Sequence, residues 1–160
     1  MSEKSNIAIF VDVQNIYYTC RETYNRQFNY RAFWNLISQQ GDIQLANAYA
    51  IDRQDSQQLG FQKALRHIGF NVKLKPFIQR SDGSAKGDWD VGITIDILDA
   101  AIKADQIVLL SGDGDFDLLL QKVSQAFGSE THVFGVEKLT AQSLIESCSC
   151  FHKIDKDLLL

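Results

Sequence analysis

Short runs of strand-forming apolar residues alternate along this chain with longer segments of helical periodicity. The clearest run, residues 6–13 (NIAIFVDV), is apolar on both faces, as in a buried parallel strand. The same pattern predicts further strands at residues 43–51, 71–78, 106–110, 131–136 and 150–154. Helical spacing and end signals predict helices at residues 14–24, 30–40, 55–68, 88–103, 115–127 and 140–147. This alternation indicates an α/β fold: a Rossmann-like three-layer α/β/α domain with a mostly parallel central sheet and right-handed crossovers.

The length of 160 residues suits one domain with its own core, and we expect a single domain over residues 1–160. Residues 1–5 are expected to be a short flexible N-terminus and residues 155–160 a C-terminal tail. The polar segment 79–87 (QRSDGSAKG) carries two glycines and is predicted to be a flexible loop. The apolar end of the tail either packs back on the sheet edge, which we favour, or joins a second subunit, so a homo-oligomer stays open.

Charge and apolar content indicate which partners and which compartment to expect for this protein. The net charge of −4 does not indicate a general polyanion binder, although an acidic metal site would have part of this charge neutralised by bound cations. No stretch has the length of a membrane span and no signal peptide opens the chain, so we expect a cytoplasmic protein without membrane contact.

The three cysteines are expected to be reduced thiols. Cys148 and Cys150 form a CxC pair without the second pair of a zinc site, and the histidines show no metal-type spacing.

Several aspartates follow the predicted strands at the edge where such sheets form their sites. Asp12 ends the first strand, Asp113 follows the fourth, and in the usual doubly wound order these two strands are neighbours. Asp90 opens the helix that leads into the fourth strand, and Asp115 lies two residues past Asp113. Carboxylates that meet repel one another unless they are protonated, paired with cations or bound to a metal, and oxygen ligands favour Mg²⁺ or Mn²⁺. Two such ions about 4 Å apart activate water and stabilise the leaving oxygen in phosphodiester cleavage.

Most of these residues also have a structural interpretation, although an aspartate that ends a buried strand, as Asp12 does, has little purely structural purpose. Asp88 and Asp115 suit helix N-caps, and Asp90 suits the positive end of a helix dipole. Asp96 lies six residues past Asp90, about 120° around the helix, and either orients the site or partners a lysine or a backbone group. Asn15 either caps a helix or holds Asp12 or a phosphate.

Basic and aromatic side chains near the same edge are candidates for substrate contacts. Arg53, Arg80 and Lys86 either hold substrate phosphates or are ordinary surface charges. The aromatic segment that follows Asn15 either stacks on bases or, as we favour, packs in the core and as a lid.

Other enzymes with this architecture lack support in the sequence. The turn after the first strand reads DVQN, without the GxGxxG of a dehydrogenase, and no GxxxxGK[ST] loop is present. A phosphoaspartate phosphatase requires Asp-x-Asp at the end of the first strand, where Gln14 stands in the third position. The acidic residues do not follow the order of a response receiver. Primase-topoisomerase domains pair Asp-x-Asp with a glutamate after the first strand, where this chain has Asp12.

Three motifs together resemble the NYN branch of the PIN-like nucleases, particularly its LabA-like members: FVDVQN, KGDWDVGITIDIL and VLLSGDGDF. The resemblance spans residues 6–154 and implies a PIN-like sheet, an acidic metal site and ribonuclease activity. It assigns catalytic roles to Asp12, Asn15, Asp90, Asp96, Asp113 and Asp115. One residue more than the family pattern separates Lys86-Gly87 from Asp90, which leaves open whether Asp88 or Asp90 faces the site and where Lys86 lies.

We therefore predict a metal-dependent ribonuclease that hydrolyses RNA with Mg²⁺ or Mn²⁺. Asp12, Asp90, Asp113 and Asp115 are the predicted metal ligands, and Arg53, Arg80 and Lys86 the predicted phosphate contacts. The main alternative is a regulatory module of the same fold that binds metal, nucleotide or a protein partner without turnover. A third hypothesis is a phosphoesterase that acts on small nucleotides.

Overall fold

The computed structural model describes residues 5–76, 78–79, 85–86 and 88–160. Its centre is a six-stranded sheet in the order β3-β2-β1-β6-β7-β8, and every neighbouring pair in it is parallel. The strands are β1 (Asn6–Asp12), β2 (Asp42–Asp52), β3 (Asn71–Pro76), β6 (Gln106–Leu110), β7 (Glu130–Gly135) and β8 (Cys150–Lys153). The helices are α1 (Val13–Tyr24), α2 (Tyr30–Ser38), α3 (Ser56–Ile68), α4 (Asp90–Ala101), α5 (Asp117–Phe127) and α6 (Gln142–Ser147). This is the predicted α/β fold, with a sheet that is wholly parallel.

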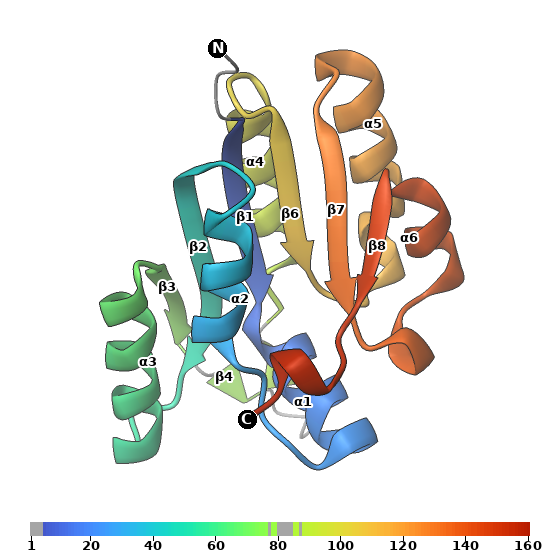
Figure 1. The fold of residues 1–160 in the computed structure, drawn as a ribbon. Helices are drawn as coiled ribbons and strands as arrows, with labels where there is room; N and C mark the ends of the chain where they lie inside the picture. The colour runs from blue at the N-terminus through green and yellow to red at the C-terminus, as the bar shows by residue number, and fades with distance from the viewer. Residues whose placement is uncertain (1–4, 77, 80–84, 87) are drawn as a thin grey trace.

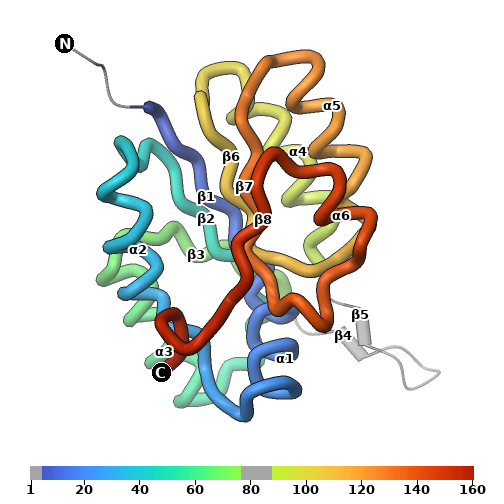
Figure 2. The backbone as a smooth tube through the Cα atoms, turned by 45° about the vertical axis from the view of Figure 1, so that its right-hand side comes forward, coloured from blue at the N-terminus to red at the C-terminus, as the bar shows by residue number. Residues whose placement is uncertain are grey.

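Two hydrophobic cores make the three layers. Helices α1, α2 and α3 pack on one face of the sheet, where Ile16, Phe33 and Leu65 are buried. Helices α4, α5 and α6 pack on the other face through Ile97, Leu120 and their neighbours. Figure 2 shows α2 and α3 on one side of the sheet and α4, α5 and α6 on the other. Alternate residues of the central strands β1 and β6 therefore face different cores, which explains why these two strands are apolar on both faces.

Strands β1 and β6 are direct neighbours, paired from Ile7 with Gln106 to Val11 with Leu110. The chain builds outward from β1 through β2 to β3, and then returns through α4 to the other side of β1. The carboxyl ends of β1 and β6 therefore flank the switch point of the sheet, where ligands bind in doubly wound folds. In Figure 1 this edge lies at the arrowheads, beside α1.

Several element ends differ from their predicted positions. The predicted flexible loop 79–87 overlaps a short antiparallel pair, β4 (Ile78–Gln79) with β5 (Ala85–Lys86). The sequence did not predict this pair, because a polar segment of this length shows no strand pattern. Residues 80–84, 87 and 77 lie outside the described part. Helix α4 begins at Asp90 rather than at residue 88, and a 3₁₀ turn (Gly114–Phe116) precedes α5.

The C-terminal segment is packed against the chain that precedes α2. Leu158 and Leu159 are buried, and Leu159 forms an antiparallel bridge with Phe28. The backbone N–H of Leu160 donates to the carbonyl of Gln27 at 2.8 Å. Of the predicted flexible N-terminus, residues 1–4 lie outside the described residues. Across the described ranges, none of the helices combines the length and the apolar character that crossing a membrane requires.

Candidate active site

Three carboxylates from separate elements meet at the switch point. Asp12 is the last residue of β1, Asp90 the first of α4, and Asp113 follows β6 by three residues. One carboxylate oxygen from each lies within 4.8 Å of the others. We call these three residues the aspartate triad. The parallel topology brings them together, because the ends of β1 and β6 and the start of α4 share one edge of the sheet.

Ser111 and Asn15 tie the two strand ends to each other. The Ser111 hydroxyl donates to Oδ2 of Asp12 at 3.1 Å and accepts from the backbone N–H of Asp113 at 3.1 Å. The side-chain Oδ1 of Asn15 accepts from the backbone N–H of Gly112 at 2.8 Å. The side chain of Asn15 therefore holds the turn after β6, and its backbone N–H donates a hydrogen bond to Asp12, while Ser111 sets the orientation of Asp12.

Gly112 is required by crowding and not by its backbone angles. A Cβ at this position would lie 2.7 Å from the carbonyl oxygen of Leu139 and 3.1 Å from the Cα of Thr140. The positive-φ glycines of the described chain are Gly69 and Gly128. The tight turn that carries Asp113 thus depends on close approach of the segment before α6.

Burial and mutual repulsion make two members of the triad, Asp12 and Asp90, hold protons strongly. Burial raises the pKa of Asp12 to about 6, with a further contribution from Asp113, while the hydrogen bond from Ser111 opposes the shift. Burial and the charges of Asp113, Asp88 and Asp12 raise the pKa of Asp90 to about 7. Near neutral pH the triad therefore resists carrying three full charges unless a cation compensates them.

The start of α4 shows which of the two neighbouring aspartates joins the triad. Asp88 is exposed, and its Oδ1 accepts from the backbone N–H of Asp90 at 3.2 Å. Between them, Trp89 donates from Nε1 to the carbonyl of Ala50 at 2.9 Å, and its ring occupies the space left by the missing side chain of Gly92. Trp89 therefore fixes the helix start on β2, and Asp90 is the residue that faces Asp12 and Asp113.

Asp96 lies outside the triad. Its Oδ2 accepts from the Tyr49 hydroxyl at 2.7 Å and from Nζ of Lys73 at 2.8 Å. These contacts join α4 to β2 and β3, which matches the lysine-partner alternative. The sequence did not reveal Lys73 or Tyr49 as partners, because nothing local links them to an aspartate that lies 23 and 47 residues further along the chain.

A family model for the NYN domain matches residues 6–155. The chain belongs to the NYN domain family. This confirms the resemblance that the three motifs predicted and places the chain among the PIN-like nucleases.

Two further proteins are similar to this chain, one in sequence and one in structure. The chain is 33% identical over 139 residues to the "Low amplitude and bright protein LabA" of Synechococcus elongatus, a match that covers 81% of this chain and 72% of LabA. A crystal structure of a Vibrio parahaemolyticus protein of unknown function, VPA0982, matches with a TM-score of 0.95 and 50% identity, and covers 100% of this chain and 99% of that one. Both matches extend over most of each chain, so the similarity covers most of the domain and not a single motif.

Of the remaining predicted residues, the structure describes the side chains of Asp115 and Arg53. Asp115 is exposed, and its backbone N–H donates to Oδ1 of Asp113 at 2.9 Å, so it shapes the turn while its carboxylate stays outside the group. Arg53 follows β2 and lines the neighbouring cleft. Arg80 and the side chain of Lys86 lie outside the described part of the chain.

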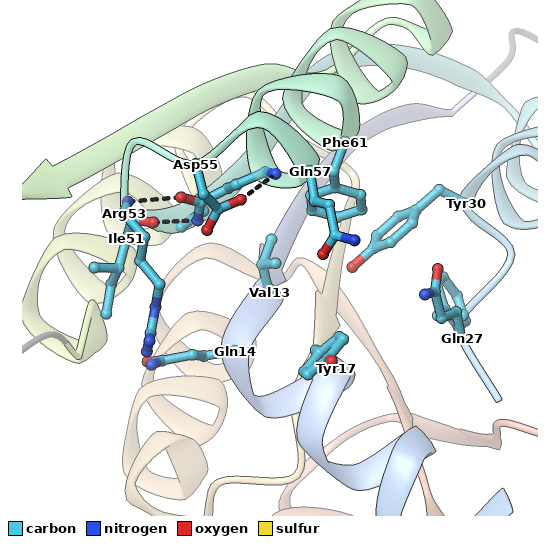
Figure 3. Close-up of a pocket in the computed structure, with 13 residues that line it drawn as sticks. Val13, Gln14, Tyr17, Gln27, Tyr30, Ile51, Arg53, Asp55, Gln57 and Phe61 are labelled. Atoms are coloured by element: carbon cyan, nitrogen blue, oxygen red, sulfur yellow. Dashed lines mark hydrogen bonds between the residues drawn. The ribbon is translucent and has the colours of Figure 1, made fainter. Parts of the chain in front are cut away.

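A cleft of about 680 Å³ begins beside the triad, at the two residues that follow Asp12. It runs between α1 and α3, and Figure 3 shows Gln14, Tyr17, Tyr30 and Phe61 around it with Arg53 near Gln14. The aromatic rings give it an apolar wall, and Tyr17 is 50% exposed. Of the aromatic segment predicted to pack in the core and as a lid, Tyr30 is buried, whereas Tyr17 is half-exposed at the cleft.

The triad fits a divalent cation by its donors and spacing. Opposite ligands of an octahedral Mg²⁺ are about 4.2 Å apart, which is compatible with oxygens grouped within 4.8 Å. All donors are carboxylate oxygens, the ligands that Mg²⁺ and Mn²⁺ prefer. A cation would also remove the repulsion that raises the pKa of Asp12 and Asp90.

Proposed function

We propose that this NYN domain is a metal-dependent ribonuclease whose active site is the aspartate triad. The observation that carries the proposal is the meeting of Asp12, Asp90 and Asp113, from three separate elements, at the switch point of an NYN sheet. The NYN family suggests RNA as the substrate.

Asp12, Asp90 and Asp113 would hold Mg²⁺ or Mn²⁺, which supplies charge neutralisation and water activation for phosphodiester hydrolysis. Ser111 and Asn15 orient the triad by holding the ends of β1 and β6 at fixed distances. Asp96 acts as a positioning residue that anchors α4, and Asp115 stands beside Asp113 as an outer carboxylate. These roles give each predicted acidic residue a place in one arrangement.

The cleft beside the triad suits the base next to the scissile phosphate. Tyr17 offers an exposed ring for stacking, which is worth about 1–3 kcal/mol per base in single-strand binding. Arg53 at the cleft, together with Arg80 and Lys86, would contact flanking phosphates. Tyr17→Ala should then raise KM for RNA about tenfold with little change in kcat, and an unchanged KM would exclude stacking on this ring.

Cleavage assays with the purified full chain test the proposal. Single-stranded and structured RNA are incubated with Mn²⁺ or Mg²⁺, beside Asp12→Asn and the control Asp99→Asn, which alters an exposed aspartate of α4. The wild type and the control should cleave at equal rates, and Asp12→Asn at least about 100-fold more slowly because a metal ligand is lost. Equal cleavage by all three proteins, or intact RNA throughout, would refute the nuclease assignment.

Two further readouts separate the alternatives. A metal-dependent rise in melting temperature without cleavage of any RNA would favour the regulatory module that binds metal without turnover. Release of phosphate from small nucleotides, with RNA left intact, would favour a phosphoesterase. DNA oligonucleotides of the same sequence measure the preference for RNA.

A further inference from the structure

A second group of metal-binding side chains lies on strands β7 and β8, at the edge of the sheet remote from β3. His132, Cys150 and His152 each offer one ligand atom within 4.8 Å of the others. The parallel register explains this, since His132 pairs with Cys150 and Phe134 pairs with His152. Residues two apart on a strand share a face, so four side chains gather on one face of the two strands.

The two imidazoles are already placed to converge. Nδ1 of His132 and Nε2 of His152 are 2.9 Å apart. The His152 ring stacks on Phe134 with centroids 4.4 Å apart and an interplanar angle of 13°, which fixes its orientation. A tetrahedral Zn²⁺ with bonds of about 2.05 Å separates two nitrogen ligands by about 3.3 Å, so the rings need to part by only a few tenths of an ångström.

Glu130 supplies an independent sign of metal-site architecture. Its Oε1 lies 2.6 Å from Nε2 of His132, whose side chain is 11% exposed. Because a carboxylate accepts, the proton lies on Nε2 and the Nδ1 lone pair of the neutral ring points toward His152 and Cys150. Metal-ligating histidines typically use such a carboxylate to fix their tautomer and orientation.

Cys150 and Cys148 have separate environments despite their CxC spacing. Cys150 is exposed beside the two histidines, whereas Cys148 is half-buried against the core under α5 and α6, with its thiol donating to the carbonyl of Ile145 at 3.2 Å. The sequence pattern CxC is therefore not the ligand unit. The cysteine ligand comes with histidines from its own strand and from the neighbouring strand.

We propose that His132, Cys150 and His152 form a Zn²⁺ site, with Glu130 as the orienting partner of His132. Two nitrogens and one thiolate match the donor set of zinc, and the exposed side of Cys150 leaves the fourth position to water. Binding releases the thiol proton of Cys150, and the neutral His152 ring carries its proton on Nδ1 once Nε2 holds the ion. The ion would join edge strand β8 to β7 and so stabilise this end of the sheet.

Cobalt substitution tests the site with a signal that the aspartate triad cannot produce. The full chain is kept reduced, saturated with Mg²⁺ and titrated with Co²⁺, and then with Zn²⁺ as competitor. One equivalent of Co²⁺ should give a thiolate charge-transfer band in the near ultraviolet and tetrahedral d–d bands, and Zn²⁺ should abolish both. A zinc concentration about a hundred times the Kd should raise the melting temperature by roughly 5–10 °C.

Matched variants distinguish zinc binding at this site from cation binding elsewhere in the protein. Cys150→Ser should abolish the thiolate band and weaken zinc binding at least about 100-fold, and Glu130→Gln should weaken it by about 10- to 100-fold. The variants Cys148→Ser and Asp12→Asn should keep the thiolate band and the zinc affinity of the wild type. Absence of the band in the wild type, or its loss in Cys148→Ser with retention in Cys150→Ser, would overturn the proposal.

Discussion

Two of the aspartates on helix α4, Asp90 and Asp96, lie in opposite electrostatic settings. Asp96 receives Lys73 and the Tyr49 hydroxyl, so its charge is compensated within the protein. Asp90 faces Asp12 and Asp113, and the pKa of Asp90 is raised to about 7. Between described residues, the ion pairs are Lys73–Asp96 and Glu130–His132, and neither involves the triad.

The difference shows which carboxylates of this domain gain from binding a cation. A carboxylate with a lysine partner holds secondary structure together, and it has little to gain from a cation. A carboxylate that repels two others gains much, because the cation removes the repulsion. The same helix thus carries one anchoring residue and one candidate ligand, and substitutions at the two positions should have opposite consequences.

The largest expected difference is in RNA cleavage. Asp90→Asn should slow Mn²⁺-dependent cleavage at least about 100-fold, because a ligand oxygen is replaced by a weaker amide. Asp96→Asn should slow it less than about tenfold, since the triad is kept. Cleavage rates at saturating Mn²⁺ measure both, and equal losses would show that Asp96 acts in the chemistry rather than through the position of α4.

Stability without metal should change in the reverse order. Asp96→Asn leaves Lys73 without its carboxylate, which costs about 1 kcal/mol at this partly exposed pair and lowers the melting temperature by about 2–4 °C. Asp90→Asn removes repulsion and should raise the melting temperature at pH 8. Thermal unfolding in a chelator measures both shifts, and a stabilised Asp96→Asn protein would contradict the anchoring role.

The substitution Ser111→Ala tests how the environment of Asp12 affects metal binding by the triad. The lost hydroxyl donor favoured the charged carboxylate, so the pKa of Asp12 should rise further and Mn²⁺ should bind about tenfold more weakly. Cleavage should recover largely at high Mn²⁺, because all three carboxylates remain. Titration of activity against Mn²⁺ measures this, with Ser38→Ala on the exposed face of α2 as control. An unchanged Mn²⁺ requirement would exclude an orienting role.

The last prediction concerns the pH dependence of stability without metal. The pKa values of Asp12 and Asp90 are raised from 3.8 to about 6 and about 7, so the folded state holds protons that the unfolded state releases. Stability should therefore fall as pH rises from about 4 to 7. Melting temperatures in a chelator should show a slope that Asp12→Asn reduces and Asp96→Asn retains, and a slope of opposite sign would contradict the raised pKa values.

Local patterns predicted much of the fold and part of the site. Buried strands such as residues 6–13 are apolar on both faces, and Asp12 and Asp113 follow strands that a doubly wound order makes neighbours. The triad was therefore accessible from sequence, because strand ends and helix starts converge by topology alone. The choice between Asp88 and Asp90 was not, since it depends on how Trp89 is pinned to β2.

The sequence by itself determined the order of strands and helices, the two-sided apolar strands and the acidic residues at their ends, because these follow from local periodicity. Tertiary structure alone decided the partner of Asp96, which comes from β2 and β3, and the meeting of His132 with Cys150 and His152 across β7 and β8. The physical reason is register: contacts between residues far apart in the chain depend on how strands pair and helices dock, and neither leaves a mark in local spacing.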